Sequence, residues 1–207
     1  MGLYLKPKKE DMMDKSLKVK KMTGIALFAG LVVVLQLFSN YVTFGPVSIT
    51  LALIPIVVGA VIYGPIAGFA LGCVGGLLVF LAPSTIALFW PYGIFVTFLV
   101  CILKMGIAGF VSGLLYKVFN SWNKLFAVII ASIIVPLLNT GLFAVAAYTI
   151  YYDLLESFAP EGQSVAVFLF LGFIGFNFII EFVVNSVLSP VVLRLSSLSK
   201  LIKVEEE

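Results

Sequence analysis

The segment Phe176–Pro190, with the sequence FNFIIEFVVNSVLSP, places a glutamate between two asparagines inside a long apolar run. Asn177, Glu181 and Asn185 follow one another at four-residue intervals, so on a helix they share one face that drifts by about 40° per step. Polar groups on the lipid face of a membrane helix are costly. We therefore expect this face to point into a helix bundle or a hydrated cavity, where a carboxylate and two amides can bind a small polar molecule.

A second set of polar residues interrupts other apolar runs. Lys104 and Glu181 are the only ionisable residues well inside these runs, and Asn139 with Thr140 breaks another one. Two interpretations are open: either Lys104 and Glu181 pair while the amides tie helices together, or all of these groups line one cavity. Because the groups come from three different runs, we favour the cavity.

Residues near the expected outer surface complete the candidate site. Gln36 and Asn40 stand at the outer end of the first apolar run, and Trp90 stands in a loop. They could close the cavity, although an anchor at the membrane interface is the commoner role of Trp. The predicted substrate-binding residues are Asn139, Asn177, Glu181, Asn185, Lys104, Thr140, Gln36, Asn40 and Trp90.

The composition argues against an enzyme. The chain has no histidine, which removes the usual general base, the commonest metal ligand and the Ser-His or Cys-His pairs of nucleophilic catalysis. Cys73 and Cys101 lie in apolar runs without metal or redox spacing. No GxxxxGK[ST] phosphate-binding loop is present either. We expect no cofactor, no metal and no catalytic residue.

The elements that must position these groups are membrane helices. The chain is 62% hydrophobic and 11% charged, and its mean hydropathy is +1.18, far from the composition of a soluble domain. We predict an all-α membrane protein with a six-transmembrane-helix bundle, and five spans as the alternative. The expected spans lie near 23–38, 48–63, 65–82, 93–116, 125–149 and 165–193. A tight turn at Tyr63-Gly64-Pro65 would separate the second span from the third.

The distribution of basic residues predicts the orientation. Seven of the 13 Lys and Arg residues precede residue 22, others flank the link between spans four and five or follow the last span, and the other three loops carry none. The positive-inside rule then puts both termini in the cytoplasm of a multi-pass cell-membrane protein. The expected parts are a basic tail (1–22), a six-helix substrate-binding domain (23–195) and a C-terminal tail (196–207). The basic tail is better read as an anchor at the lipid surface than as a nucleic-acid arm.

Small residues recur at helical spacing. Gly64, Gly68, Gly72 and Gly76 form one row, Gly109 and Gly113 another, and Ala26 and Gly30 a third. Such rows let two helix backbones approach closely. We expect the first two rows to pack inside the bundle, and the row on span one to be a docking face for another membrane subunit.

The order of these features is similar to that of a known family. The stretch ITLALIPIVVGAVIYGPIAGFALGCVGGLL (Ile49–Leu78), with its IPxxxGAxxxGPxAGxxxGxxGG pattern, and the closing FNFIIEFVVNSVLSPVV resemble the substrate-binding S components of energy-coupling factor (ECF) vitamin transporters. The resemblance extends from about residue 23 to 195. Within the family, the pantothenate type is the most similar.

The resemblance implies a six-helix subunit that holds a vitamin near the outer face, in a pocket built from spans four to six. It also implies that Ala26 and Gly30 dock on a transmembrane coupling subunit, and that two ATPase subunits complete the importer. The family usually has alanine at both docking positions, so Gly30 departs from the pattern but stays small.

The substrate stays open between a few classes. Lys104 suits the carboxylate of pantothenate, and Asn139, Asn177 and Asn185 suit its other groups, while Glu181 would repel a carboxylate unless it is protonated or paired. Glu181 suits instead a pyridoxine- or pyrimidine-like molecule. The alternative outside this family is a stand-alone secondary carrier that uses Lys104 and Glu181 as an ion relay.

Overall fold

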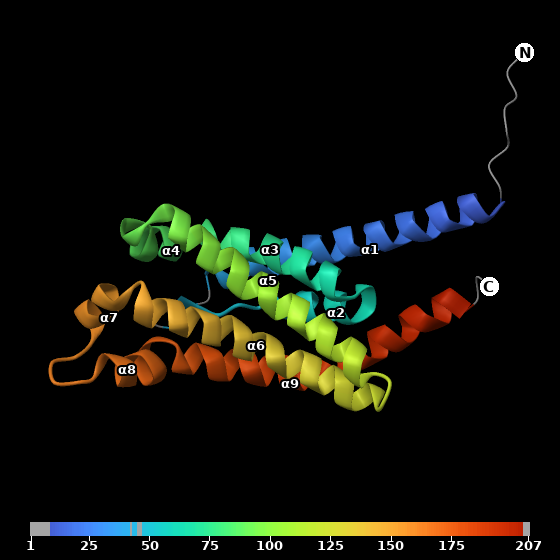
Figure 1. The fold of residues 1–207 in the computed structure, drawn as a ribbon. Coiled ribbons are helices and arrows are strands. Elements are labelled where there is room, and N and C mark those ends of the chain that lie inside the picture. The colour runs from blue at the N-terminus through green and yellow to red at the C-terminus, as the bar shows by residue number, and fades with distance from the viewer. Residues whose placement is uncertain (1–8, 42, 45–46, 205–207) are drawn as a thin grey trace, which may run out of the picture.

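The computed structural model describes residues 9–41, 43–44 and 47–204, which form an elongated helix bundle (Figure 1). The long helices are α1 (Lys9–Ser39), α5 (Ile94–Phe119), α6 (Lys124–Thr149) and α9 (Gly175–Val204). The shorter elements are α2 (Leu53–Tyr63), α3 (Pro65–Phe80), α4 (Pro83–Phe89), the 3-10 turn η1 (Trp90–Tyr92), α7 (Tyr152–Phe158), α8 (Val165–Phe168) and the π-helical turn η2 (Leu169–Phe173). Strands β1 (Thr43–Phe44) and β2 (Val47–Ser48) pair antiparallel.

The helical membrane architecture is confirmed, but the six-span count is not. In the described residues, four helical stretches are long and apolar enough to cross a membrane, and a fifth arises if Pro65–Phe80 and Pro83–Tyr92, bent by 69°, count as one. Helix α2 has only 11 residues, about 16 Å at 1.5 Å per residue, against a hydrocarbon core of about 30 Å. The second expected span is therefore too short to cross by itself.

Side chains from other helices accept hydrogen bonds from the backbone just before α2. The expected span begins near residue 48, yet the helix begins at Leu53. The backbone N–H of Thr50 donates to Glu181 Oε1 at 2.7 Å, and that of Leu51 donates to Ser39 Oγ at 3.0 Å. Segment 49–52 is thus held by α1 on one side and α9 on the other.

The expected tight turn between α2 and α3 is confirmed. Gly64 has a φ of +96°, a conformation that costs glycine little because it has no Cβ. Pro65 is the first residue of α3, where its missing N–H would have had no partner. The two helices fold back on each other, so that Gly59 faces Leu71.

The glycine row of α3 packs inside the bundle against α5, as expected. A Cβ added at Gly68, Gly72 or Gly76 would meet the backbone carbonyl groups of Gly109, Met105 and Cys101 respectively. The two backbones are therefore in direct contact along three successive turns.

The ends of the bundle hold different elements. The start of α1, the end of α9 and the link between α5 and α6 lie at one end, and α4, α7 and α8 lie at the other (Figure 1). Within the predicted tails, α1 already begins at Lys9 and α9 continues to Val204, while residues 1–8 and 205–207 lie outside the described part. The domain boundaries and the cytoplasmic orientation stay predictions.

We predict that Gly72→Ala destabilises the protein, because the new methyl group would strike the Met105 carbonyl group, which cannot move without shifting α5. The expected loss is about 1–3 kcal/mol, as for overpacked cores, measured by thermal unfolding in detergent. Gly141→Ala is the matched control, since a Cβ there meets nothing within 4 Å. Equal melting temperatures for the two variants would contradict the packing of α3 on α5.

Candidate functional site

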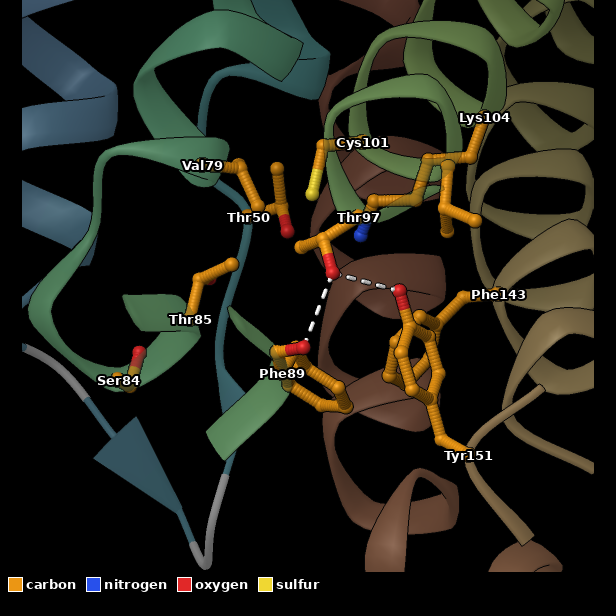
Figure 2. A pocket seen from close by; sticks show the side chains of 11 residues that line it. Thr50, Val79, Ser84, Thr85, Phe89, Thr97, Cys101, Lys104, Phe143 and Tyr151 are labelled. Carbon is orange, nitrogen blue, oxygen red and sulfur yellow. Dashed lines mark hydrogen bonds between the residues drawn. The ribbon is translucent and has the colours of Figure 1, made fainter. Parts of the chain in front are cut away.

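Two adjoining cavities lie in the half of the bundle nearest α4 and α7. The larger, which we call the hydroxyl cavity, is lined by Thr50, Val79, Ser84, Thr85, Phe89, Thr97, Val100, Cys101, Lys104, Phe143 and Tyr151 (Figure 2). The smaller, the amide cavity, is lined by Thr50, Lys104, Asn139, Thr140, Phe143, Ile174, Asn177 and Glu181. They share Thr50, Lys104 and Phe143.

Glu181 lies in the wall of the amide cavity and is 4% exposed. Its Oε1 accepts the hydrogen bond from the Thr50 backbone. Its Oε2 has no hydrogen-bond partner. A buried carboxylate oxygen without a partner is costly, so the Glu181 carboxyl group still lacks a hydrogen-bond donor at this atom.

Lys104 stands where the two cavities meet and is 7% exposed. Its Nζ lies 4.8 Å from the centroid of the Phe143 ring, a cation–π contact. It attracts the Glu181 carboxyl group electrostatically, but among the described residues no salt bridge joins the two. Both side chains thus line the amide cavity and do not form a salt bridge with each other.

Three further predicted residues line the amide cavity. Asn139 and Thr140 come from α6, and Asn177 comes from α9 one turn before Glu181. Asn139 is 3% exposed, and its Oδ1 is a second buried acceptor without a partner. Five of the nine predicted residues, from α5, α6 and α9, therefore meet around one cavity.

The other four predicted residues do not line either cavity. Asn185 is buried but donates from Nδ2 to the backbone oxygen of Glu181 in its own helix, at 2.8 Å. Gln36 donates from Nε2 to Asn40 Oδ1 at 3.2 Å, one turn further along α1. Trp90 stacks on Phe80, with ring centroids 5.1 Å apart.

The hydroxyl cavity contains polar residues that the sequence did not single out. Thr97 in α5 is 1% exposed, and its Oγ1 bonds both the backbone oxygen of Phe89, at 3.1 Å, and the phenol oxygen of Tyr151, at 2.9 Å (Figure 2). Thr97 lies seven residues before Lys104, on the same helix face, and that spacing was the available signal. Burial raises the pKa of Tyr151 above its ordinary value, so the phenol keeps its proton at neutral pH.

The predicted docking residues Ala26 and Gly30 are exposed on α1. Around them stand Met22, Leu27, Leu31 and Val34, each at least half exposed. A Cβ at Gly30 would meet nothing within 4 Å. The surface is therefore open and apolar, and its role as an interface stays a prediction.

The site is built for binding. It combines one ammonium, one carboxyl group, amides and hydroxyl groups with the apolar walls of Val79, Val100 and Phe143. In the described part of the chain, no group of three His, Cys, Asp or Glu residues could hold a metal ion. Convergent polar groups on apolar walls are typical of sites that orient a small molecule.

Comparison with known proteins identifies a relationship over most of the chain. The family model of the ECF transporter, substrate-specific component, matches residues 20–193. No curated protein matches the chain.

Proposed function

The chain belongs to the substrate-specific components of ECF transporters, and on this premise we propose that it binds pantothenate for import. The family consists of transporter subunits and not of enzymes. It also implies that the chain works with the components of an ECF module on a small-molecule substrate. The choice of pantothenate as the substrate goes beyond the family and depends on the chemistry of the two cavities.

The observation that carries the proposal is the balance of charge and hydrogen bonding in the site. Lys104 is a buried cation without a salt bridge among the described residues, while Glu181 Oε2 and Asn139 Oδ1 are buried acceptors without a partner. A complementary ligand brings one anionic group and several hydrogen-bond donors, because each buried group left unsatisfied costs free energy.

Pantothenate has this composition. Its carboxylate suits Lys104, and its two hydroxyl groups suit Asn139 Oδ1 and Glu181 Oε2 in the amide cavity. Its paired methyl groups, which lie between the two hydroxyl groups, suit the apolar wall of the amide cavity at Phe143 and Ile174. The Lys104 ammonium, which also attracts the Glu181 carboxyl group, would offset the repulsion between that group and a ligand carboxylate.

Neutral or cationic vitamins complement the site less well. A pyridoxine-like molecule supplies donors for Glu181 but no anion for Lys104, and a cationic pyrimidine would meet the ammonium directly. The proposed importer further comprises a transmembrane coupling subunit and two ATPase subunits. These supply the energy, since the chain has no phosphate-binding loop.

The proposed orientation places the cavities toward the outside of the cell. The first half of α1, which carries Lys18, Lys20 and Lys21, and the end of α5, which carries Lys117, lie toward the end of the bundle opposite α4 and α7 (Figure 1). With that end in the cytoplasm by the positive-inside rule, α4 and α7 face outward and the site opens on the side from which a vitamin arrives.

We predict that Lys104→Met weakens the binding of pantothenate by about ten- to a hundredfold, the value of one hydrogen bond to a charged group. Calorimetric titration of the purified chain measures it. Panthenol, in which an alcohol replaces the carboxylate, should bind the variant and the unchanged chain with similar affinity. Lys117→Met, at an exposed position outside both cavities, is the control. Tight binding of another vitamin with no heat from pantothenate would exclude the proposed substrate.

We also predict an order of effects at Glu181. In Glu181→Gln, the side-chain carbonyl group can still accept the Thr50 N–H, so segment 49–52 keeps its position. The Gln side chain then has an NH2 group in place of Oε2, so both variants lose the second acceptor, but only Glu181→Ala also loses the bond to Thr50. The Ala variant should therefore bind pantothenate about tenfold more weakly than the Gln variant. Equal affinities would show that the bond to Thr50 does not shape the site.

The docking surface gives a third prediction. Ala26→Leu should prevent co-purification with the coupling subunit, because the larger side chain keeps the partner helix away, and pantothenate binding should be unchanged. Gly141→Leu places the same side chain at an open position on α6 and should assemble normally. Normal assembly of Ala26→Leu would refute the assignment of α1.

A further inference from the structure

A chain of hydrogen bonds crosses the wall of the hydroxyl cavity from α7 to α4. The phenol of Tyr151, at the start of α7, bonds Thr97 Oγ1 at 2.9 Å, and the same oxygen bonds the backbone carbonyl of Phe89 at 3.1 Å (Figure 2). Tyr151 and Thr97 are each 1% exposed, and both line the cavity.

The direction of these hydrogen bonds follows from the last acceptor in the series, the backbone carbonyl group of Phe89. A backbone carbonyl group only accepts, so the single hydroxyl hydrogen of Thr97 is used on Phe89. Thr97 Oγ1 must then accept from Tyr151, and the single phenol hydrogen is used as well. The Tyr151 oxygen therefore offers the cavity its lone pair and no hydrogen.

This direction makes Tyr151 selective. A ligand group that donates to the Tyr151 oxygen gains a hydrogen bond and leaves the bonds of Tyr151 to Thr97 and of Thr97 to Phe89 intact. A ligand acceptor has to take the phenol hydrogen away from Thr97, which breaks a buried bond, or else face a lone pair. The cavity already contains a better partner for an anion, the Lys104 ammonium.

We infer that Tyr151 is a specificity-determining residue whose phenol oxygen accepts the amide N–H of the ligand. The inference rests on the proposed function. Tyr151 and Lys104 line the same cavity, and in pantothenate the amide N–H is the donor nearest to the carboxylate. The carboxylate at Lys104 and the N–H at Tyr151 thus occupy the hydroxyl cavity, and the two hydroxyl groups extend into the amide cavity.

The test compares two ligands in four proteins. Pantothenate is titrated beside its ester analogue, in which an oxygen replaces the amide N–H. The unchanged chain should prefer the amide by about tenfold or more, because the ester oxygen would face the Tyr151 oxygen with no hydrogen between them. In Tyr151→Phe the preference should vanish, while the ring keeps its packing on Phe89, at 4.9 Å between centroids.

Thr97 supplies a matched pair of variants. Thr97→Ala frees the phenol hydrogen of Tyr151, which can then donate to the ester oxygen, so the preference for the amide should fall. Thr97→Ser retains the hydroxyl group and should retain the preference. Because each result is a ratio of two affinities in one protein, a general loss of stability does not alter it.

The outcomes separate the two proposals. If pantothenate binds and Tyr151→Phe keeps the preference of the unchanged chain, the role of Tyr151 is wrong while the substrate stands. The same conclusion follows if Thr97→Ala and Thr97→Ser behave alike. If the unchanged chain does not bind pantothenate, the proposed function fails and this inference fails with it.

Discussion

The hydrogen bond from the Thr50 backbone to the Glu181 carboxyl group joins positions 131 residues apart, and the site depends on it. A buried carboxyl group must find partners, because its desolvation is expensive. Segment 49–52 supplies one of them and is thereby held between α1 and α9. The second oxygen has no hydrogen-bond partner. One side chain thus holds the segment before α2 against α9 and keeps one acceptor unsatisfied.

The contact between α3 and α5 orients the side chains of α5 that line the hydroxyl cavity. Gly68, Gly72 and Gly76 bring the α3 backbone against α5, which sets the rotation of α5 about its own axis. Thr97 and Lys104, seven residues apart, then share the face that lines the hydroxyl cavity. Gly30 on α1 meets none of the described side chains or backbone in this way. Glycine therefore closes one helix pair and leaves the α1 surface open at this position.

The sequence predicted the charged and amide residues of the site but only part of the rest. A lysine, a glutamate and an asparagine inside apolar runs are too costly to face lipid, so Lys104, Glu181 and Asn139 had to converge. Hydroxyl residues carry no such penalty, because they can bond their own helix, and Thr97 therefore gave little signal. Asn185 matched the spacing but satisfied itself on its own backbone. The sequence did not show where α2 begins, because the partners of the backbone just before it, Glu181 and Ser39, belong to other helices.

The distribution of packed and open space explains why binding and transport need different proteins. Around the second half of α5 and the first half of α6, the buried residues Met105, Ala108, Ala127, Val128 and Val135 are fully enclosed and pack against α2 and α3. These residues follow Lys104 on α5 and precede Asn139 on α6, so they lie toward the end of the bundle that holds the link between the two helices (Figure 1). A ligand bound at Lys104, as we propose, would have close-packed side chains on one side, and passage through them would break contacts that give such a core its stability. The opening of that core, or the movement of the whole bundle with its ligand, requires work from outside the chain, which is the part an energy-coupling module supplies.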